Sequence, residues 1–442
     1  MVMTEDPRTG VDPVEELRDW LRDSWDPDLT VGEWWERLGL AGWANPLLPP
    51  DRYGRGVSRG DSLRISRAIV EHGALGPPAG LGLMLAAPTI ATHGTAEQVE
   101  RFVRDIVTGQ RAWCQLFSEP GAGSDLAGLA TKAVRDGDVW IVNGQKVWTS
   151  GGQIADMGML ITRTNPDAPK HQGITWFAFD MHQPGVEVRP LREMTGSAMF
   201  NEVFLSDATV ADADRIGDVN DGWAVANTTL LWERSGMGAG GGERHGARPG
   251  TIAGDLDKRA GDFVRPSKPK AKPARSEPEA GERRESPAAL YIELARRMGK
   301  DTDPVVRQDL VKAHILGELS RMNTERHKAV KAAGGDIPGL PSFSKLLMAD
   351  ILRHNRDMGA RLLGPRAMLH AYDEEGRATL ADAPGGNAAH VVTAQILSAQ
   401  ALPIYGGTDQ IQRNIVGERA LGLPKEPGDL SRVPFNQLPR NG

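Results

Sequence analysis

Residues 113–210 contain a succession of short strand-like runs and tight-turn signals, and this pattern constrains the fold more than any other feature of the chain. Asp136-Gly137 and Asn143-Gly144 favour two-residue hairpins, because both turn positions in such dipeptides accept a positive φ. They flank the strand-like run 138–142. Further runs of this kind follow at 157–164, 174–181, 186–190 and 202–205. We therefore predict a small antiparallel β domain.

Helical patterns flank the β region on both sides. Thr95 and Gln98 have the spacing of a capping box, and an apolar stripe with helical periodicity follows them. Downstream, Asp303-Pro304 is a strong helix start, and a last helix is predicted from about Thr408 to Gly422. The chain is thus predicted to have an α+β fold with three domains. These are an N-terminal helical domain (1–112), the central β domain (113–216) and a C-terminal helical bundle (217–442).

The segment 238–287 interrupts the C-terminal helical pattern. It opens with a glycine run and becomes rich in Pro, Lys, Arg and Glu, with few bulky apolar residues. Burial cannot offset the ordering entropy of such a stretch, so we predict a disordered, mobile surface insertion. A solvated linker is the simplest interpretation, and a basic docking arm for an acidic partner is the alternative.

Charge and cysteine content argue against several classes of protein. The 442 residues carry 52 basic and 58 acidic side chains, a net charge of −6, so no overall basic field would attract nucleic acid. The single cysteine, Cys114, allows no intrachain disulfide, and the histidines lack metal-ligand spacing, so we expect no metal. The polar N-terminus and the short apolar runs predict a cytoplasmic protein without a membrane span.

Three segments carry the signals for chemistry. The first is QLFSEPGAGSD at 115–125, a strand leading into a glycine turn with hydroxyls. Backbone N–H groups exposed in such a turn can approach a phosphate or a polar ring. The second is NGQKVWTSG at 143–151, a tight turn followed by a short strand. The third is PIYGGTDQIQR at 403–413, a glycine loop that opens the last helix.

These three segments, in this order, resemble the flavin-contacting segments of the acyl-CoA dehydrogenase family. Weaker likenesses at 94–100 and 362–364 extend the resemblance over nearly the whole chain apart from the 238–287 insertion. The resemblance implies an FAD cofactor, an acyl-CoA substrate and an electron-transfer flavoprotein as electron acceptor. It also implies a C-terminal four-helix bundle, a tetrameric assembly and a role in lipid metabolism such as fatty acid β-oxidation.

The resemblance places flavin contacts in all three segments. They are Gln115, Phe117, Ser118, Ser124, Trp148, Thr149, Ser150, Thr408 and Gln410. Ser124 is also expected to approach the acyl-CoA. Read without the family, the hydroxyls and the tryptophan are ordinary strand residues, and Thr408 is a helix N-cap, a role compatible with a flavin contact.

Removal of the α-proton of a thioester needs a carboxylate base, and the developing enolate oxygen needs hydrogen-bond donors. In many family members the base is a glutamate just before Gly-Thr in the third segment. This chain has Gly406 there, whose backbone N–H can still bind the thioester oxygen. A second group of relatives carries the base on a bundle helix, and Glu233 falls at that position. Arg234 falls where the family often places a substrate-contacting arginine. We predict Glu233 as the base; the alternative is a surface Glu–Arg pair.

Three other functions stay open from the sequence. Gly406 is compatible with a noncatalytic or half-site subunit of an α2β2 hetero-tetramer, although Glu233 argues against that assignment. A flavin-binding protein that retains the fold without dehydrogenation is the second possibility, because a fold does not guarantee an activity. An oxidase that passes electrons to oxygen is the third. The type of acyl group is not indicated by the sequence.

Overall fold

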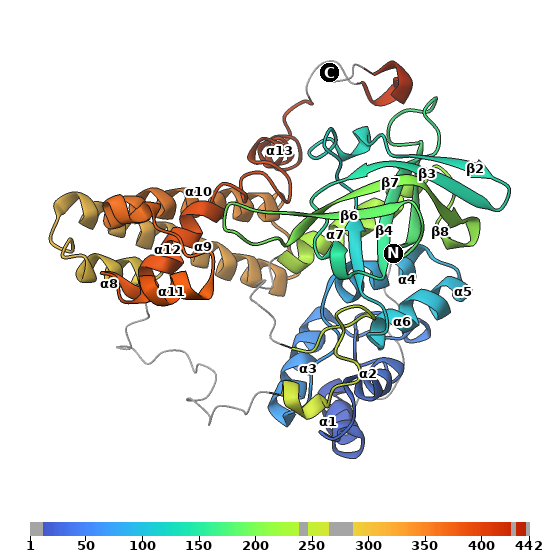
Figure 1. Ribbon diagram of the computed structural model, residues 1–442, viewed down its shortest axis with the longest axis horizontal. Helices are drawn as coiled ribbons and strands as arrows, with labels where there is room; N and C mark the ends of the chain where they lie inside the picture. The colour runs from blue at the N-terminus through green and yellow to red at the C-terminus, as the bar shows by residue number, and fades with distance from the viewer. Residues whose placement is uncertain (1–11, 238–245, 265–285, 426–429, 439–442) are drawn as a thin grey trace. The chain divides into compact units, whose positions relative to one another are not determined.

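The computed structural model describes residues 12–237, 246–264, 286–425 and 430–438. Two compact units are present (Figure 1). Unit 1 comprises Met1–Leu191, Met199–Pro273 and Leu430–Gly442, and unit 2 comprises Arg192–Ala198 and Ala274–Asp429. Helices, then strands, then further helices follow one another along the chain, which confirms the predicted α+β class. Within the described ranges, no helix has the length and apolar character needed to cross a membrane.

The N-terminal helices of unit 1 enclose a tryptophan-rich core. These helices are α1 (Pro13–Ser24), α2 (Val31–Leu40), α3 (Arg59–His72), α4 (Ala87–His93), α5 (Ala96–Gln98) and α6 (Arg104–Val107), with π-helical turns at Gly82–Ala86 and Val99–Val103. Trp34, Trp35 and Trp43 are buried. The indole N–H groups of Trp34 and Trp35 donate to the carbonyls of Leu75 and Gly76 at 2.7 and 2.8 Å, so these large side chains are buried without an unsatisfied donor.

The β region forms one eight-stranded sheet. Its strands are β1 (Trp113–Leu116), β2 (Lys132–Asp136), β3 (Val139–Lys146), β4 (Met157–Arg163), β5 (Ile174–Asp180), β6 (Val186–Leu191), β7 (Phe200–Ala211) and β8 (Arg215–Ile216). The order is β6-β7-β3-β2-β4-β5-β8, with β1 paired to β4 outside this path. The pairs β1–β4 and β2–β4 are parallel, so the sheet is mixed and the antiparallel prediction is corrected. Hairpin signals report only pairing between sequence neighbours, whereas parallel pairs join distant segments.

Only one of the two predicted tight turns joins a hairpin. Gly137, with φ +60°, lies in the turn between β2 and β3 as predicted. Asn143-Gly144 instead lies inside β3, where the register with β7 shifts at a β-bulge. A Cβ at Gly144 would lie 2.4 Å from Thr131 Oγ1. Glycine is therefore required there by a close approach of two chain segments, which the sequence pattern does not distinguish from a turn.

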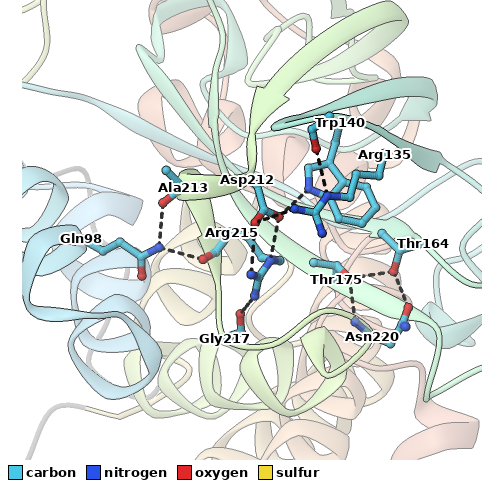
Figure 2. A network of polar contacts seen from close by, with 11 residues as sticks. Gln98, Arg135, Trp140, Thr164, Thr175, Asp212, Ala213, Arg215, Gly217 and Asn220 are labelled. Atoms are coloured by element: carbon cyan, nitrogen blue, oxygen red, sulfur yellow. Dashed lines mark hydrogen bonds and ion pairs between the residues drawn. The ribbon is translucent and has the colours of Figure 1, made fainter.

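A polar network fixes the segment that leads from the sheet into the next helix (Figure 2). Asp212 accepts hydrogen bonds from Trp140 Nε1 at 2.8 Å and from Arg215 Nε at 3.1 Å. Gln98 of α5 donates through Nε2 to the carbonyls of Ala213 and Arg215, both at 2.8 Å. This segment is therefore held by the N-terminal helices and by β3 at the same time.

Helix α7 (Gly222–Met237) packs against β5 and α4. A Cβ at Gly222 would lie 2.6 Å from the backbone of Thr175 in β5, so only glycine lets the helix begin this close to the strand. The buried hydroxyls of Thr229 and Thr89 lie 3.0 Å apart. The predicted boundary at residue 217 groups α7 with the C-terminal helices, whereas its packing places it in unit 1.

Residues 246–264, inside the predicted insertion, pack on the first part of unit 1. Val31 N donates to the carbonyl of Lys258 at 2.8 Å, and Thr251 N donates to the fully buried carboxylate of Asp156 at 3.1 Å. Disorder is therefore the wrong prediction for these residues. Hydrogen bonds to sequence-distant partners stabilise an ordered conformation that the few apolar side chains of the segment would not stabilise alone. Residues 238–245 and 265–285 of the predicted insertion lie outside the described residues.

Unit 2 contains the C-terminal helices. They are α8 (Ala289–Arg297), α9 (Pro304–Ala332), α10 (Leu340–Leu363), α11 (Glu374–Ala381), α12 (Gly386–Ser398) and α13 (Asp409–Ile415). Figure 1 shows α8, α9, α10 and α12 as a bundle. Leu294, Leu362 and Val392 are buried together in one hydrophobic core cluster of this unit. Asp303 caps α9 by accepting from Val305 N at 2.8 Å, as its Asp-Pro signal predicts.

Candidate active site

The first motif segment begins in β1 and continues as a tight glycine turn. Glu119 and Ala122 exchange two backbone hydrogen bonds of 3.1 Å across this turn. At Gly121 and Gly123 no atom of the described residues lies within 4 Å of the point that a Cβ would occupy, so the backbone there is open to a ligand. Among the predicted flavin contacts of this segment, Phe117 is buried, Ser118 is half-buried and Ser124 is exposed.

The second motif segment is bonded directly to the first. Val147 N donates to the carbonyl of Ser118 at 2.9 Å, so the end of β3 lies against the end of β1. Lys146 strengthens the junction through a buried ion pair with Glu119, in which Nζ and Oε1 are 2.9 Å apart. On its other side, Thr149 exchanges two backbone hydrogen bonds of 3.0 Å with Asn201 of β7.

Trp148 and Thr149 provide the features that fit a flavin. Trp148 has φ +62°, uncommon for a bulky residue, and the residue is 61% exposed. Thr149 is fully buried, and its Oγ1 has no hydrogen-bond partner among the described residues. A buried hydroxyl normally has a partner, and the exposed aromatic side chain of the preceding residue, Trp148, suits contact with a planar ring. The residues present therefore fit an isoalloxazine ring. Ser150, next along the chain, is half-buried.

Glu233 lies on α7, one helical turn after the buried Thr229. Gln115 of β1 reaches it, with Nε2 donating to Glu233 Oε2 at 3.3 Å, and this contact is partly buried. The side chain of Gln115, predicted as a flavin contact, therefore points to the predicted base. Arg234 also lies in α7, but its side chain is outside the described residues.

The third motif segment belongs to unit 2. Gly406 and Gly407 have φ values of +63° and +83°. Thr408 is the N-cap of α13, with Oγ1 accepting from Ile411 N at 3.2 Å, and Gln410 is exposed. Lys345 Nζ donates to the carbonyl of Gly407 at 2.6 Å. The loop therefore has a defined backbone conformation in which position 406 takes the left-handed form that favours glycine.

Asp409, just after this loop, is buried in unit 2. Its carboxylate lies 2.8 Å from an Arg353 nitrogen and 3.4 Å from Lys345 Nζ. Burial alone would favour the neutral acid, but these two cations outweigh it, so the pKa of Asp409 lies below its usual value of 3.8. The carboxylate thus joins α13 to α10, and Lys345 joins both to the glycine loop.

Several of these positions were not predicted from the sequence. Glu119 and Lys146 lie inside recognised segments, but their pairing joins two segments 27 residues apart and has no local signal in the sequence. Asn201 and Asp409 carried no local signal, because their importance comes from partners far away in the sequence. No group of three or more possible metal-ligating side chains occurs in the part of the chain that the structure describes.

Comparisons with known proteins agree with this arrangement of a helical domain, a sheet carrying the two bonded motif segments, and a helical bundle. Residues 13–110, 114–208 and 290–421 match the models of the acyl-CoA dehydrogenase N-terminal, middle and C-terminal domains, respectively. The fold and the site thus define a flavoprotein oxidoreductase of the acyl-CoA-oxidising type.

Individual relatives allow a more specific statement. Acyl-CoA dehydrogenase IpdE1 of Mycobacterium tuberculosis is 32% identical over 397 residues, which cover 89% of this chain and 88% of IpdE1. The chain therefore belongs to the acyl-CoA dehydrogenase family. Acyl-CoA dehydrogenase FadE34 of the same organism is 38% identical over 376 residues, 85% of this chain, but the chain spans only 44% of FadE34.

A solved structure of a two-component complex shares the fold. The ChsE4-ChsE5 complex from Mycobacterium tuberculosis matches with a TM-score of 0.60 at 26% identity, covering 96% of this chain and 100% of the matched chain. The family implies a flavin cofactor, and the exposed Trp148 and the Thr149 hydroxyl, which has no partner among the described residues, fit one.

Proposed function

We propose that this chain catalyses the FAD-dependent α,β-dehydrogenation of an acyl-CoA thioester with Glu233 as the base. The observation that carries this proposal is the hydrogen bond from Gln115 Nε2 to Glu233 Oε2. It puts the carboxylate of α7 against the strand that runs into the first flavin-type segment. A surface Glu–Arg pair, the alternative interpretation, has no reason to face that strand.

Each residue then has a definite task. Glu233 takes the proton from Cα of the acyl group, and Gln115 orients the carboxylate by donating to one of its oxygens. The flavin, when bound, supplies the acceptor for the hydride that leaves Cβ. Trp148 and the hydroxyl of Thr149 are proposed to hold the ring, and the open backbone of the glycine turn to approach the cofactor.

The remaining assignments stay predictions. They are the cofactor contacts of Phe117, Ser118, Ser124, Ser150, Thr408 and Gln410 and the substrate contacts of Ser124, Arg234 and Gly406. An electron-transfer flavoprotein as acceptor, a tetrameric assembly, a cytoplasmic location and a role in fatty acid β-oxidation are likewise proposed from the family resemblance. The domain limits at 112/113 and 216/217 also stay predictions.

A spectral titration tests the function. The purified chain, loaded with FAD, is mixed without oxygen with straight-chain, branched and ring-bearing acyl-CoAs, and the flavin absorbance is followed. The proposal expects bleaching by at least one of these thioesters, with the corresponding enoyl-CoA as product. Failure of the chain to bind FAD at all would contradict the proposal.

A half-site role in a hetero-oligomer is the second candidate. It is favoured by Gly406, which leaves the position before Gly407-Thr408 without an acidic side chain, and by the similarity to a chain of the ChsE4-ChsE5 complex. This candidate predicts that the isolated chain binds FAD but does not bleach with any acyl-CoA. Bleaching would then appear only after a second, related chain is added.

A further inference from the structure

Lys146 and Glu119 form an ion pair in the interior of unit 1. The Lys146 side chain is fully buried and that of Glu119 is 8% exposed, with 2.9 Å between Nζ and Oε1. Lys146 Nζ also donates to the carbonyl of Phe117 at 3.1 Å. A fully buried lysine is rare in proteins unless its charge is paired. No step of the proposed reaction uses either side chain.

The pair joins three segments of the site. Glu119 accepts from Ala130 N at 2.6 Å and from Thr131 N at 2.9 Å, which ties the glycine turn to the residues before β2. Lys146 is the last residue of β3 and lies two positions before Trp148. The ion pair therefore lies where the first motif segment, the start of β2 and the second motif segment meet.

The charges of the two partners depend on each other. Burial opposes ionisation of Glu119, but Lys146 and the two backbone N–H groups outweigh it, so the pKa of Glu119 lies below its usual value. Burial also lowers the pKa of Lys146, and the attraction of Glu119 only partly offsets this effect. Removal of one partner would leave the other as an uncompensated buried group.

We propose that the Lys146–Glu119 pair is a positioning device for the flavin, which sets the second motif segment against the first. The pair acts through the backbone: Lys146 fixes the carbonyl of Phe117, and the bond from Val147 N to the carbonyl of Ser118 lies beside it. It thereby determines where Trp148 and Thr149 present their side chains. This inference rests on the proposed function, because it assumes that the bound group is a flavin.

The experiment compares three variants of the full chain. Lys146→Met and Glu119→Gln each remove one charge of the pair with little change in side-chain size. Lys258→Met is the matched control, because Lys258 also pairs with a buried carboxylate of unit 1, that of Asp255 at 2.6 Å, but lies in the 246–264 segment. FAD affinity is measured by fluorescence titration, bound-flavin orientation by visible circular dichroism, and folding by far-ultraviolet circular dichroism.

A positioning role predicts about tenfold weaker FAD binding in both pair variants, together with an altered visible circular dichroism spectrum, because a preorganised site has been loosened. Lys258→Met should lose some thermal stability and keep the wild-type flavin signals. Wild-type FAD affinity and spectra in folded Lys146→Met and Glu119→Gln would overturn the inference. If Lys146→Met does not fold, the FAD affinity and visible circular dichroism spectrum of Glu119→Gln test the inference alone. Absence of FAD binding by the wild-type chain would instead contradict the proposed function.

Discussion

The side-chain amide of Gln115 on β1 donates to the carboxylate of Glu233 on α7, with 3.3 Å between Nε2 and Oε2. The two residues are distant in sequence, and the contact exists because β5 and α4 hold α7 close to the sheet. It links the strand that enters the first flavin-type segment to the proposed base, and it supports the proposed orienting role of Gln115 beside the predicted flavin contact.

Substitution of Gln115 separates these two roles. In Gln115→Leu we expect the rate of flavin bleaching to fall about tenfold, because the carboxylate loses the donor that orients it. FAD affinity should stay at the wild-type value. Gln172→Leu, a change at an exposed glutamine of unit 1, is the control and should alter neither quantity. A large loss of FAD affinity in Gln115→Leu would support the flavin contact over the positioning role.

Thr149→Val should move stability and flavin affinity in opposite directions. The Thr149 hydroxyl is buried without a partner among the described residues, so its removal should stabilise the FAD-free protein by about 1 kcal/mol. The same change should weaken FAD binding, because the hydroxyl is proposed to bond the ring. Thermal unfolding of the FAD-free chain and FAD titration measure the two effects. Unchanged FAD affinity would show that the Thr149 hydroxyl does not bond the flavin.

Gly406→Ala should destabilise unit 2. Position 406 has φ +63°, and a side chain in the left-handed region costs about 1 kcal/mol relative to glycine. Gly417→Ala is the matched control, because the nearest atom of the described residues to a Cβ there would be Leu423 Cδ1, at an ordinary 3.6 Å. Urea unfolding of the two variants should show a lower midpoint for Gly406→Ala alone. Equal midpoints would show that the loop readily adopts another conformation.

Asp409 should make the stability of unit 2 sensitive to acid. Its pKa in the folded protein lies below 3.8, so the stabilisation from its charge is fully present above that value and is lost as the pH falls through the lower, folded pKa. Asp409→Asn should therefore be less stable than the wild type at pH 7, and the difference should shrink below pH 3.8. Urea unfolding at several pH values measures this, and a constant difference would contradict it.

The sequence predicted those parts of the fold that depend on local signals. The Asp303 N-cap, the hairpin at Asp136-Gly137 and the three motif segments could be recognised because turn and capping residues act within a few positions. The bulge at Gly144 could not, because it depends on the approach of Thr131, and the packing of 246–264 depends on Val31 and Asp156.

The same limit applies to the candidate site. Residue types and family spacing pointed to Glu233, Trp148 and Thr149, but not to the Gln115–Glu233 bond or to the buried Lys146–Glu119 pair. These contacts form only when β1, β3 and α7 pack together in three dimensions, so no local pattern in the sequence predicts them.

The most direct test of the central claim is the rate of flavin bleaching in Glu233→Gln, measured by anaerobic stopped flow with an acyl-CoA that bleaches the wild type. Glu97→Gln, at an exposed residue of α5, is the matched control. We expect Glu233→Gln to bind FAD normally and to bleach about 10³-fold more slowly, as expected for loss of a general base, while Glu97→Gln behaves as wild type. Bleaching of Glu233→Gln at the wild-type rate would contradict the assignment of Glu233 as the base.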